Sequence, residues 1–169
     1  MTSASPPRRV GRAALHLIVR RQVTTLSTDL VLVVVRATLA WVFAYYGAGK
    51  LFGWYGGPGL HQSALFFAAT AHLRPGILFA VVGGVAEFGG AVLLVLGLGS
   101  RVAGLALVGD MALAVLTVTG KYGINSQSAT PGYELNLALG VLALVVVVLG
   151  AGRFSLDALV ERRAATPTP

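Results

Sequence analysis

The stretch GILFAVVGGVAEFGGAVLLVLGL, residues 76–98, contains a single ionisable side chain, that of Glu87. An α-helix needs about 20 mostly apolar residues to cross the hydrocarbon core of a bilayer. The bilayer core has no water to satisfy backbone polar groups, so a spanning segment must bond its own backbone internally. The stretch therefore predicts a membrane-spanning helix, although its many valines would favour a strand in a soluble protein.

Three further segments have the same character, at residues 30–48, 102–120 and 135–151. The composition agrees with them, because 56% of the residues are apolar and only 11% are charged. A soluble domain usually carries about 25% charged residues. We therefore expect an all-α, integral membrane four-helix bundle.

The connections divide the chain into three parts. Residues 1–26 form a basic tail, either a surface helix or a solvated segment, and residues 27–152 form the bundle. Residues 153–169 form a second tail whose end is expected to be disordered. Within the bundle, residues 60–73 are too few to span and predict a short interfacial helix between spans one and two.

The distribution of Lys and Arg predicts the orientation, because cytoplasmic loops carry an excess of basic residues. One side holds Arg8, Arg9, Arg12, Arg20, Arg21, Arg101, Arg153, Arg162 and Arg163, and the other holds Lys50, Arg74 and Lys121. We expect both termini to be cytoplasmic. The net charge is +7, and the basic residues that give rise to it flank the apolar spans. This placement argues against nucleic acid as a partner and for the lipid bilayer.

Three ionisable residues fall near the middle of predicted spans: Arg36, Glu87 and Asp110. Each would cost roughly 2.5 to 3.5 kcal/mol at the centre of a helix in lipid. We expect them to face the bundle interior as a polar core in which Arg36 pairs with one or both carboxylates. Such a core either holds the helices in register or lines a site for a polar head group or a proton path. Alternatively, Arg36 snorkels to a surface.

A second polar layer is predicted near the outer surface. Lys50 ends span one and Glu134 begins span four, so we expect them to pair, and with Trp54 and Tyr133 they form a candidate outer mouth. Aromatic residues gather at the same level: Tyr45, Tyr46, Trp54, Tyr55, Tyr122 and Tyr133. They form either an interfacial belt or a pocket for a flat ring such as a quinone.

Several chemistries are excluded by what the chain lacks. It has no Cys, which removes disulfides, thiol catalysis, thiolate metal sites and covalent haem attachment. None of its three histidines lies within a predicted span, so we expect no metal site and assign no catalytic residue. Small residues at 80, 84, 86 and 90 allow close helix packing, either within the bundle or in a homo-oligomer.

Four short motifs occur in order along the chain: GKLFGW at residues 49–54 running into GGPG at 56–59, AEFGG at 86–90, GL at 97–98 with Arg101, and GYE at 132–134. With these motifs and Arg36, the chain resembles the DoxX family of small bacterial membrane proteins. The likeness covers roughly residues 30–160. Asp110 departs from the family, in which an apolar residue is expected.

The resemblance implies a four-helix bundle in the plasma membrane. The family takes its name from a subunit of a thiosulfate:quinone oxidoreductase, and its members are linked to sulfur metabolism or oxidative-stress defence. The first hypothesis is therefore a membrane subunit of a redox complex that interacts with quinone, at most a quinone-site or non-catalytic subunit that receives electrons from a partner. The second is a non-enzymatic scaffold or assembly factor. The third is a small proton-coupled transporter.

Overall fold

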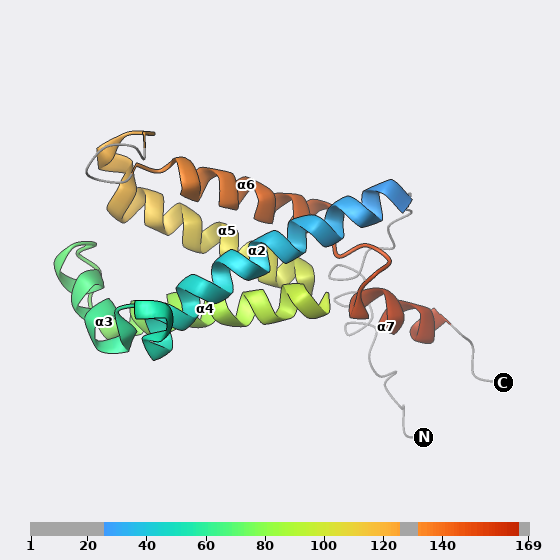
Figure 1. Ribbon diagram of the computed structural model, residues 1–169, viewed down its shortest axis with the longest axis horizontal. Coiled ribbons are helices and arrows are strands. Elements are labelled where there is room, and N and C mark those ends of the chain that lie inside the picture. Colours follow the sequence, from blue (N-terminus) through green and yellow to red (C-terminus); the bar gives the residue numbers. More distant parts are fainter. Residues whose placement is uncertain (1–25, 126–131, 166–169) are drawn as a thin grey trace, which may run out of the picture.

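The computed structural model describes residues 26–125 and 132–165, and these are overwhelmingly helical (Figure 1). Long helices form where the sequence predicts spans: α2 (Leu26–Phe52), α4 (Gly76–Leu96), α5 (Ser100–Ala114) and α6 (Glu134–Leu149). A π-helical turn, η2 (Val115–Thr119), and a 3-10 turn, η3 (Gly120–Tyr122), prolong α5. Shorter elements are η1 (Trp54–Gly56), α3 (Gly59–Ala69) and α7 (Leu156–Ala165).

The all-α membrane bundle is confirmed, with one difference in the number of long spans. Within the described residues three helical segments are long and apolar enough to cross a membrane: α2, α4 and the continuous segment Ser100–Tyr122. α6 is equally apolar but has 16 residues, which is about 24 Å against a hydrocarbon core of about 30 Å. α6 still packs beside α5 along its length, as Figure 1 shows.

The interior of the bundle is apolar and closely packed. Leu39 and Phe43 of α2 meet Leu94 of α4, Leu107 of α5 and Val146 of α6 in one cluster of fully or almost fully buried side chains. The outer surface is apolar too. Such a surface is expected where lipid rather than water surrounds the helices.

The two ends of the bundle carry different elements. α3 and η1 lie at the end where α2 finishes, whereas α7 lies at the end where α2 begins (Figure 1). The beginning and the end of the described chain therefore lie at the same end of the bundle. The tail of residues 1–25 lies outside the described residues, so the surface helix expected there is not tested.

The C-terminal segment is more than the tail that the sequence predicts. Its helix, α7, turns back onto the bundle and caps α5 from outside. The Asp157 carboxylate accepts hydrogen bonds from the backbone N–H groups of Gly99 (2.8 Å) and Ser100 (3.1 Å). These are amides at the start of a helix, which have no partner within it. Nearby, Arg153 forms an ion pair with buried Asp29 of α2 (Nε–Oδ2, 3.2 Å).

Arg36 belongs to this same end of the bundle, and the predicted pairing with Glu87 or Asp110 is wrong. Its guanidinium donates to four backbone carbonyl groups, those of Leu94 (2.8 Å), Val95 (3.2 Å), Ala151 (2.8 Å) and Phe154 (3.0 Å). The first two belong to the last turn of α4, where the carbonyl groups lack the N–H donors that a further turn of helix would supply. Arg36 therefore joins α2, α4 and the segment that leads into α7.

The glycine-rich turn after α2 folds back onto that helix. A Cβ atom at Gly57 would collide with the backbone of Gly49, because the two glycines pack against each other without side chains. This contact brings η1 beneath the end of α2 and directs the chain into α3. The predicted short helix between spans one and two is present as α3.

Candidate functional site

Lys50 and Glu87 form a buried ion pair at the end of the bundle that carries α3. Lys50 Nζ lies 2.6 Å from Glu87 Oε1, and the Glu87 side chain is 3% exposed against 26% for Lys50. Lys50 comes from the last turn of α2 and Glu87 from the middle of α4. The two helices approach closely at Gly47, where a Cβ atom would lie 2.5 Å from the backbone nitrogen of Phe88. The glycine thus allows the ion pair to form.

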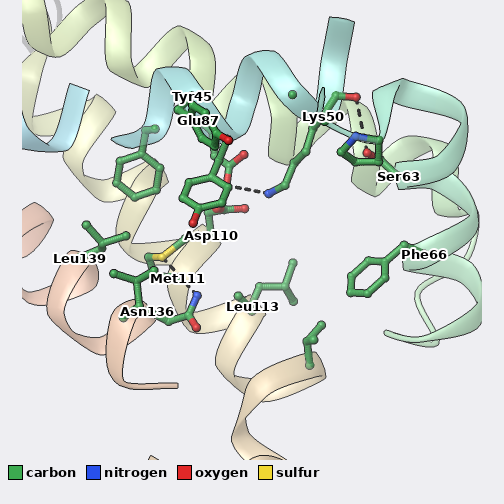
Figure 2. Close-up of a pocket in the computed structure, with 18 of the residues that line it drawn as sticks. Tyr45, Lys50, Ser63, Phe66, Glu87, Asp110, Met111, Leu113, Asn136 and Leu139 are labelled. Atoms are coloured by element: carbon green, nitrogen blue, oxygen red, sulfur yellow. Dashed lines mark hydrogen bonds and ion pairs between the residues drawn. The ribbon is translucent and has the colours of Figure 1, made fainter. Parts of the chain in front are cut away.

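Asp110 reaches the same place from α5. Figure 2 shows the Asp110 carboxyl group beside the carboxyl group of Glu87 and the ammonium group of Lys50. The approach is again over a glycine, because a Cβ atom at Gly83 of α4 would lie 3.4 Å from Asp110 Oδ1. The polar core therefore exists, but Lys50 rather than Arg36 supplies its cation. The predicted pair of Lys50 with Glu134 is wrong, and Glu134 is exposed to the outside.

These three side chains face a cavity of about 540 Å³. It is lined by residues of α2, η1, α3, α4, α5 with its π turn, and α6, and Figure 2 shows part of its lining. Of the candidate outer mouth, Lys50 and Trp54 line the cavity, whereas Tyr133 and Glu134 do not. The neighbouring residues of α6, Leu135 and Asn136, occupy the wall in their place.

Aromatic rings make up one wall of the cavity. Tyr45 and Tyr55 are stacked, with ring centroids 5.3 Å apart and planes inclined by 20°. Trp54 meets Tyr55 edge to face at 6.5 Å, and Tyr46 meets Tyr45 in the same way at 5.5 Å. All four rings line the cavity. The aromatic cluster predicted from the sequence therefore contributes to a pocket, apart from Tyr122 and Tyr133, which do not line it.

A sequence model of the DoxX family matches residues 31–120, more than half of the 169-residue chain. The chain belongs to the DoxX family. The match begins in α2 and ends at the close of the π turn, so it includes all three members of the Lys50–Glu87–Asp110 group. No curated protein and no solved structure matches the chain.

Beyond the part that the DoxX model matches, α6 contributes a polar side chain that the sequence analysis overlooked. Asn136 accepts a hydrogen bond at Oδ1 from Thr119 Oγ1 (3.2 Å) and donates from Nδ2 to Met111 Sδ (3.5 Å). It lies across the cavity from Lys50 (Figure 2). The sequence could have indicated this residue, because Asn136 lies inside an apolar segment and a side-chain amide in a span needs a hydrogen-bond partner.

The π turn is a second feature of the wall that the sequence did not predict. Residues 115–119 adopt the wider helix, and Thr117, Val118 and Thr119 line the cavity. Single π turns occur often at functional sites in helices. The Thr117 hydroxyl donates to the carbonyl of Leu113 (2.8 Å), which satisfies it within the helix. The turn therefore shapes the cavity without leaving that hydroxyl unpaired.

Glu87 Oε2 accepts no hydrogen bond from an N–H or hydroxyl group of the described residues, and the Glu87 carboxyl group lies within hydrogen-bond reach of the Asp110 carboxyl group, with which it can share a proton. Buried polar atoms in folded proteins nearly always have a partner. The Lys50 ammonium group uses one of its three donors on Glu87 Oε1. The site of this DoxX protein thus places two carboxyl groups and one ammonium group beside an aromatic wall.

Proposed function

We propose that this DoxX protein binds the head group of a quinone in the cavity beside Lys50, Glu87 and Asp110, as the membrane subunit of a redox complex in the plasma membrane. The observation that carries the proposal is the combination of the Lys50–Glu87–Asp110 group with an aromatic wall in one cavity. Pockets for small molecules are mainly apolar and contain a few convergent polar groups that fix the orientation of the ligand.

The residues suit the two faces and the rim of a quinone ring. A quinone carbonyl accepts hydrogen bonds, and the Lys50 ammonium group is a donor that is only partly used by Glu87. The hydroxyl of a reduced ring donates, and Glu87 Oε2 is an acceptor that no N–H or hydroxyl group of the described residues uses. The stacked pair of Tyr45 and Tyr55 provides apolar area of the same flat shape.

The division of tasks within the complex follows from the composition. A bound quinone supplies the capacity to take up electrons and protons. The chain's own side chains bind and orient the ring, exclude water from it, and hold protons at the Glu87 and Asp110 carboxyl groups. Since the chain has no Cys and no histidine in a span, a soluble or membrane partner delivers the electrons.

The two tryptophans make binding measurable. Trp54 lines the cavity, whereas Trp41 is 81% exposed on the outer surface of α2. In a Trp41→Phe protein, Trp54 is therefore the sole tryptophan, and a quinone in the cavity will quench it by contact. Titration of this protein in mild detergent with a tailless benzoquinone should give saturable quenching.

Glu87→Gln and Glu134→Gln form a matched pair of controls, because both remove one negative charge and only Glu87 faces the cavity. We expect Glu87→Gln to weaken quinone binding about tenfold. This factor corresponds to about 1.4 kcal/mol, which is the size of a hydrogen bond to a charged group. Glu134→Gln should leave binding unchanged. Quenching that rises linearly with quinone concentration and never saturates would exclude the cavity as the binding site. An equal loss of quinone affinity in Glu87→Gln and Glu134→Gln would exclude it as well.

A further inference from the structure

A second, smaller cavity lies on the other side of Asp110. It has a volume of about 270 Å³ and lies between α4 and α5, with the end of α3 above it. Its lining is apolar apart from the Asp110 carboxyl group. The residues that line it are Phe67, Phe79, Val82, Gly83, Ala86, Ala106, Gly109, Asp110 and Leu113.

The two cavities adjoin one another. Phe67, Asp110 and Leu113 line both of them, so these three side chains form the partition. Two of the three are apolar, and Phe67 is carried by the short helix α3 rather than by a long span. A molecule that fills the first cavity thus needs to pass only this partition to reach the second.

The second cavity opens onto the outer surface of the bundle. Val82 of α4 and Ala106 and Gly109 of α5 are exposed, whereas Gly83 between them is buried. Gly83, Ala106 and Gly109 have little or no side chain to fill the space between the two helices, and in a membrane protein such an apolar surface meets lipid chains. The cavity is therefore a lateral recess that leads from lipid to Asp110.

We propose that the second cavity holds the hydrocarbon tail of the ligand whose head group occupies the first, so that the chain binds tailed, membrane-dissolved quinones rather than small water-soluble ones. This rests on the proposed function. The argument is the match between each part of the ligand and its surroundings, since ammonium, carboxyl and aromatic groups surround the head and apolar side chains surround the tail. Burial of each CH2 group contributes to affinity.

A larger side chain at Gly109 would fill the second cavity, because this glycine lines it. A Cβ atom there would meet nothing within 4 Å, so Gly109→Leu places its side chain in open space along α5. Gly89 of α4 is the matched control, because a Cβ atom there would touch only Val85 Cγ1 at 4.0 Å and the residue lines neither cavity. Ala106→Phe is a second variant that narrows the same recess, should Gly109→Leu lower the yield of folded protein.

The experiment uses two probes at a fixed detergent concentration, a tailless benzoquinone and the same head group with a decyl chain. Quenching of Trp54 in the Trp41→Phe protein measures both. We expect Gly109→Leu and Ala106→Phe to weaken binding of the decyl probe about tenfold and to leave the tailless probe unchanged, while Gly89→Leu changes neither. Circular dichroism establishes that each variant is folded.

The outcomes separate the two proposals. If the tailless probe binds and Gly109→Leu leaves the affinity for the decyl probe unchanged, the tail lies elsewhere and this inference is overturned, whereas the proposed function stands. If neither probe binds the parent protein saturably, the proposed function fails and the inference fails with it. Equal weakening of both probes in Gly109→Leu would likewise overturn the inference, because it would place the head group in the recess.

Discussion

Arg36 is 4% exposed and satisfies its buried charge with carbonyl groups rather than with a carboxylate. The last carbonyls of a helix have no partner within it and carry the negative end of the helix dipole. Arg36 lies beside the last turn of α4, and its guanidinium has donors enough for those carbonyls and for two more near α7. A Cβ atom at Gly97 would lie 2.6 Å from one guanidinium nitrogen, so the glycine after α4 makes room for the arginine.

Arg36→Ala should therefore destabilise the bundle strongly. Four carbonyls lose the guanidinium as donor, of which that of Leu94 keeps the N–H group of Gly97 (3.2 Å), and each buried polar group left unsatisfied costs about 1–3 kcal/mol. We expect a loss of at least about 3 kcal/mol of unfolding free energy and poor recovery of monodisperse protein. Thermal unfolding in detergent, followed by circular dichroism, measures it. Arg74→Ala, at an exposed arginine between α3 and α4, is the control, and equal melting temperatures for the two variants would refute the role of Arg36.

Lys50 and Glu87 should be coupled in stability. Lys50→Met leaves the Glu87 carboxylate buried without its cation, which costs about 3–5 kcal/mol when a buried pair is broken. Adding Glu87→Gln to Lys50→Met removes that charge and should restore part of the loss. Reversible unfolding in mixed micelles gives a double-mutant cycle, for which we expect a coupling of at least about 1 kcal/mol. Strict additivity of the two changes would show that the ion pair is absent in the membrane.

The sequence identified the residues of the site better than their partners. Lys50, Glu87, Asp110 and Trp54 were all singled out, because a charge in a span or an aromatic residue at its end is conspicuous in an apolar chain. Which residues pair depends on how far α2 and α4 are displaced along one another. The amino-acid sequence gives no direct measure of that displacement. That displacement puts Lys50 beside Glu87 and Arg36 beside the last turn of α4.

At the scale of elements, the wall of the cavity depends on how η1 lies against α2. Gly57→Ala would place a methyl group into the backbone of Gly49 and push η1, with Trp54 and Tyr55, away from the cavity. We expect a lower melting temperature and at least about a tenfold loss of quinone affinity, measured by Trp54 quenching.

Gly56→Ala is the comparison for that change. Gly56 has a φ of +75°, but a Cβ atom there would meet nothing within 4 Å. Only backbone strain of about 1 kcal/mol is expected, and the wall stays in place. If Gly56→Ala lowers quinone affinity as much as Gly57→Ala does, close packing of the two glycines is not what positions the wall.

The helices themselves were largely predictable from the length of the apolar segments. The predicted spans at residues 76–98 and 102–120 correspond to Gly76–Leu96 and Ser100–Tyr122. α7 was not predicted, since the residues that dock it are charged and the sequence alone suggests a solvated tail. Asp157 has a partner only because the chain folds back to the start of α5. The π turn was equally invisible, because residues 115–119 have the same apolar character as the turns before them.

At the scale of the whole molecule, the bundle has one closed end and one end that holds the cavity. Arg36, Asp29 and Asp157 join α7 to the helices at the first end. α3 lies at the other end (Figure 1), and α3 and η1 line the cavity there. If the basic residues face the cytoplasm as the positive-inside rule predicts, the proposed quinone site faces the outer leaflet.

Single cysteines can test this orientation, because the parent chain contains none. His61→Cys places a thiol on exposed α3, and Arg163→Cys places one on exposed α7. In intact cells a membrane-impermeant maleimide should label the first and not the second, and in inverted vesicles the pattern should reverse. Labelling of Arg163→Cys in intact cells would invert the assigned topology, and labelling of both from one side would contradict the bundle's placement across the membrane.

The measurement that tests the central claim most directly is photo-crosslinking of the purified protein with an azidobenzoquinone, followed by mass spectrometry of the labelled peptides. The account predicts label on the segment from Tyr45 to Pro58 and on α5 near Asp110, with loss of that label in excess quinone and in Glu87→Gln. Label confined to outward-facing residues such as Trp41 and Leu116, and unaffected by competition, would contradict it.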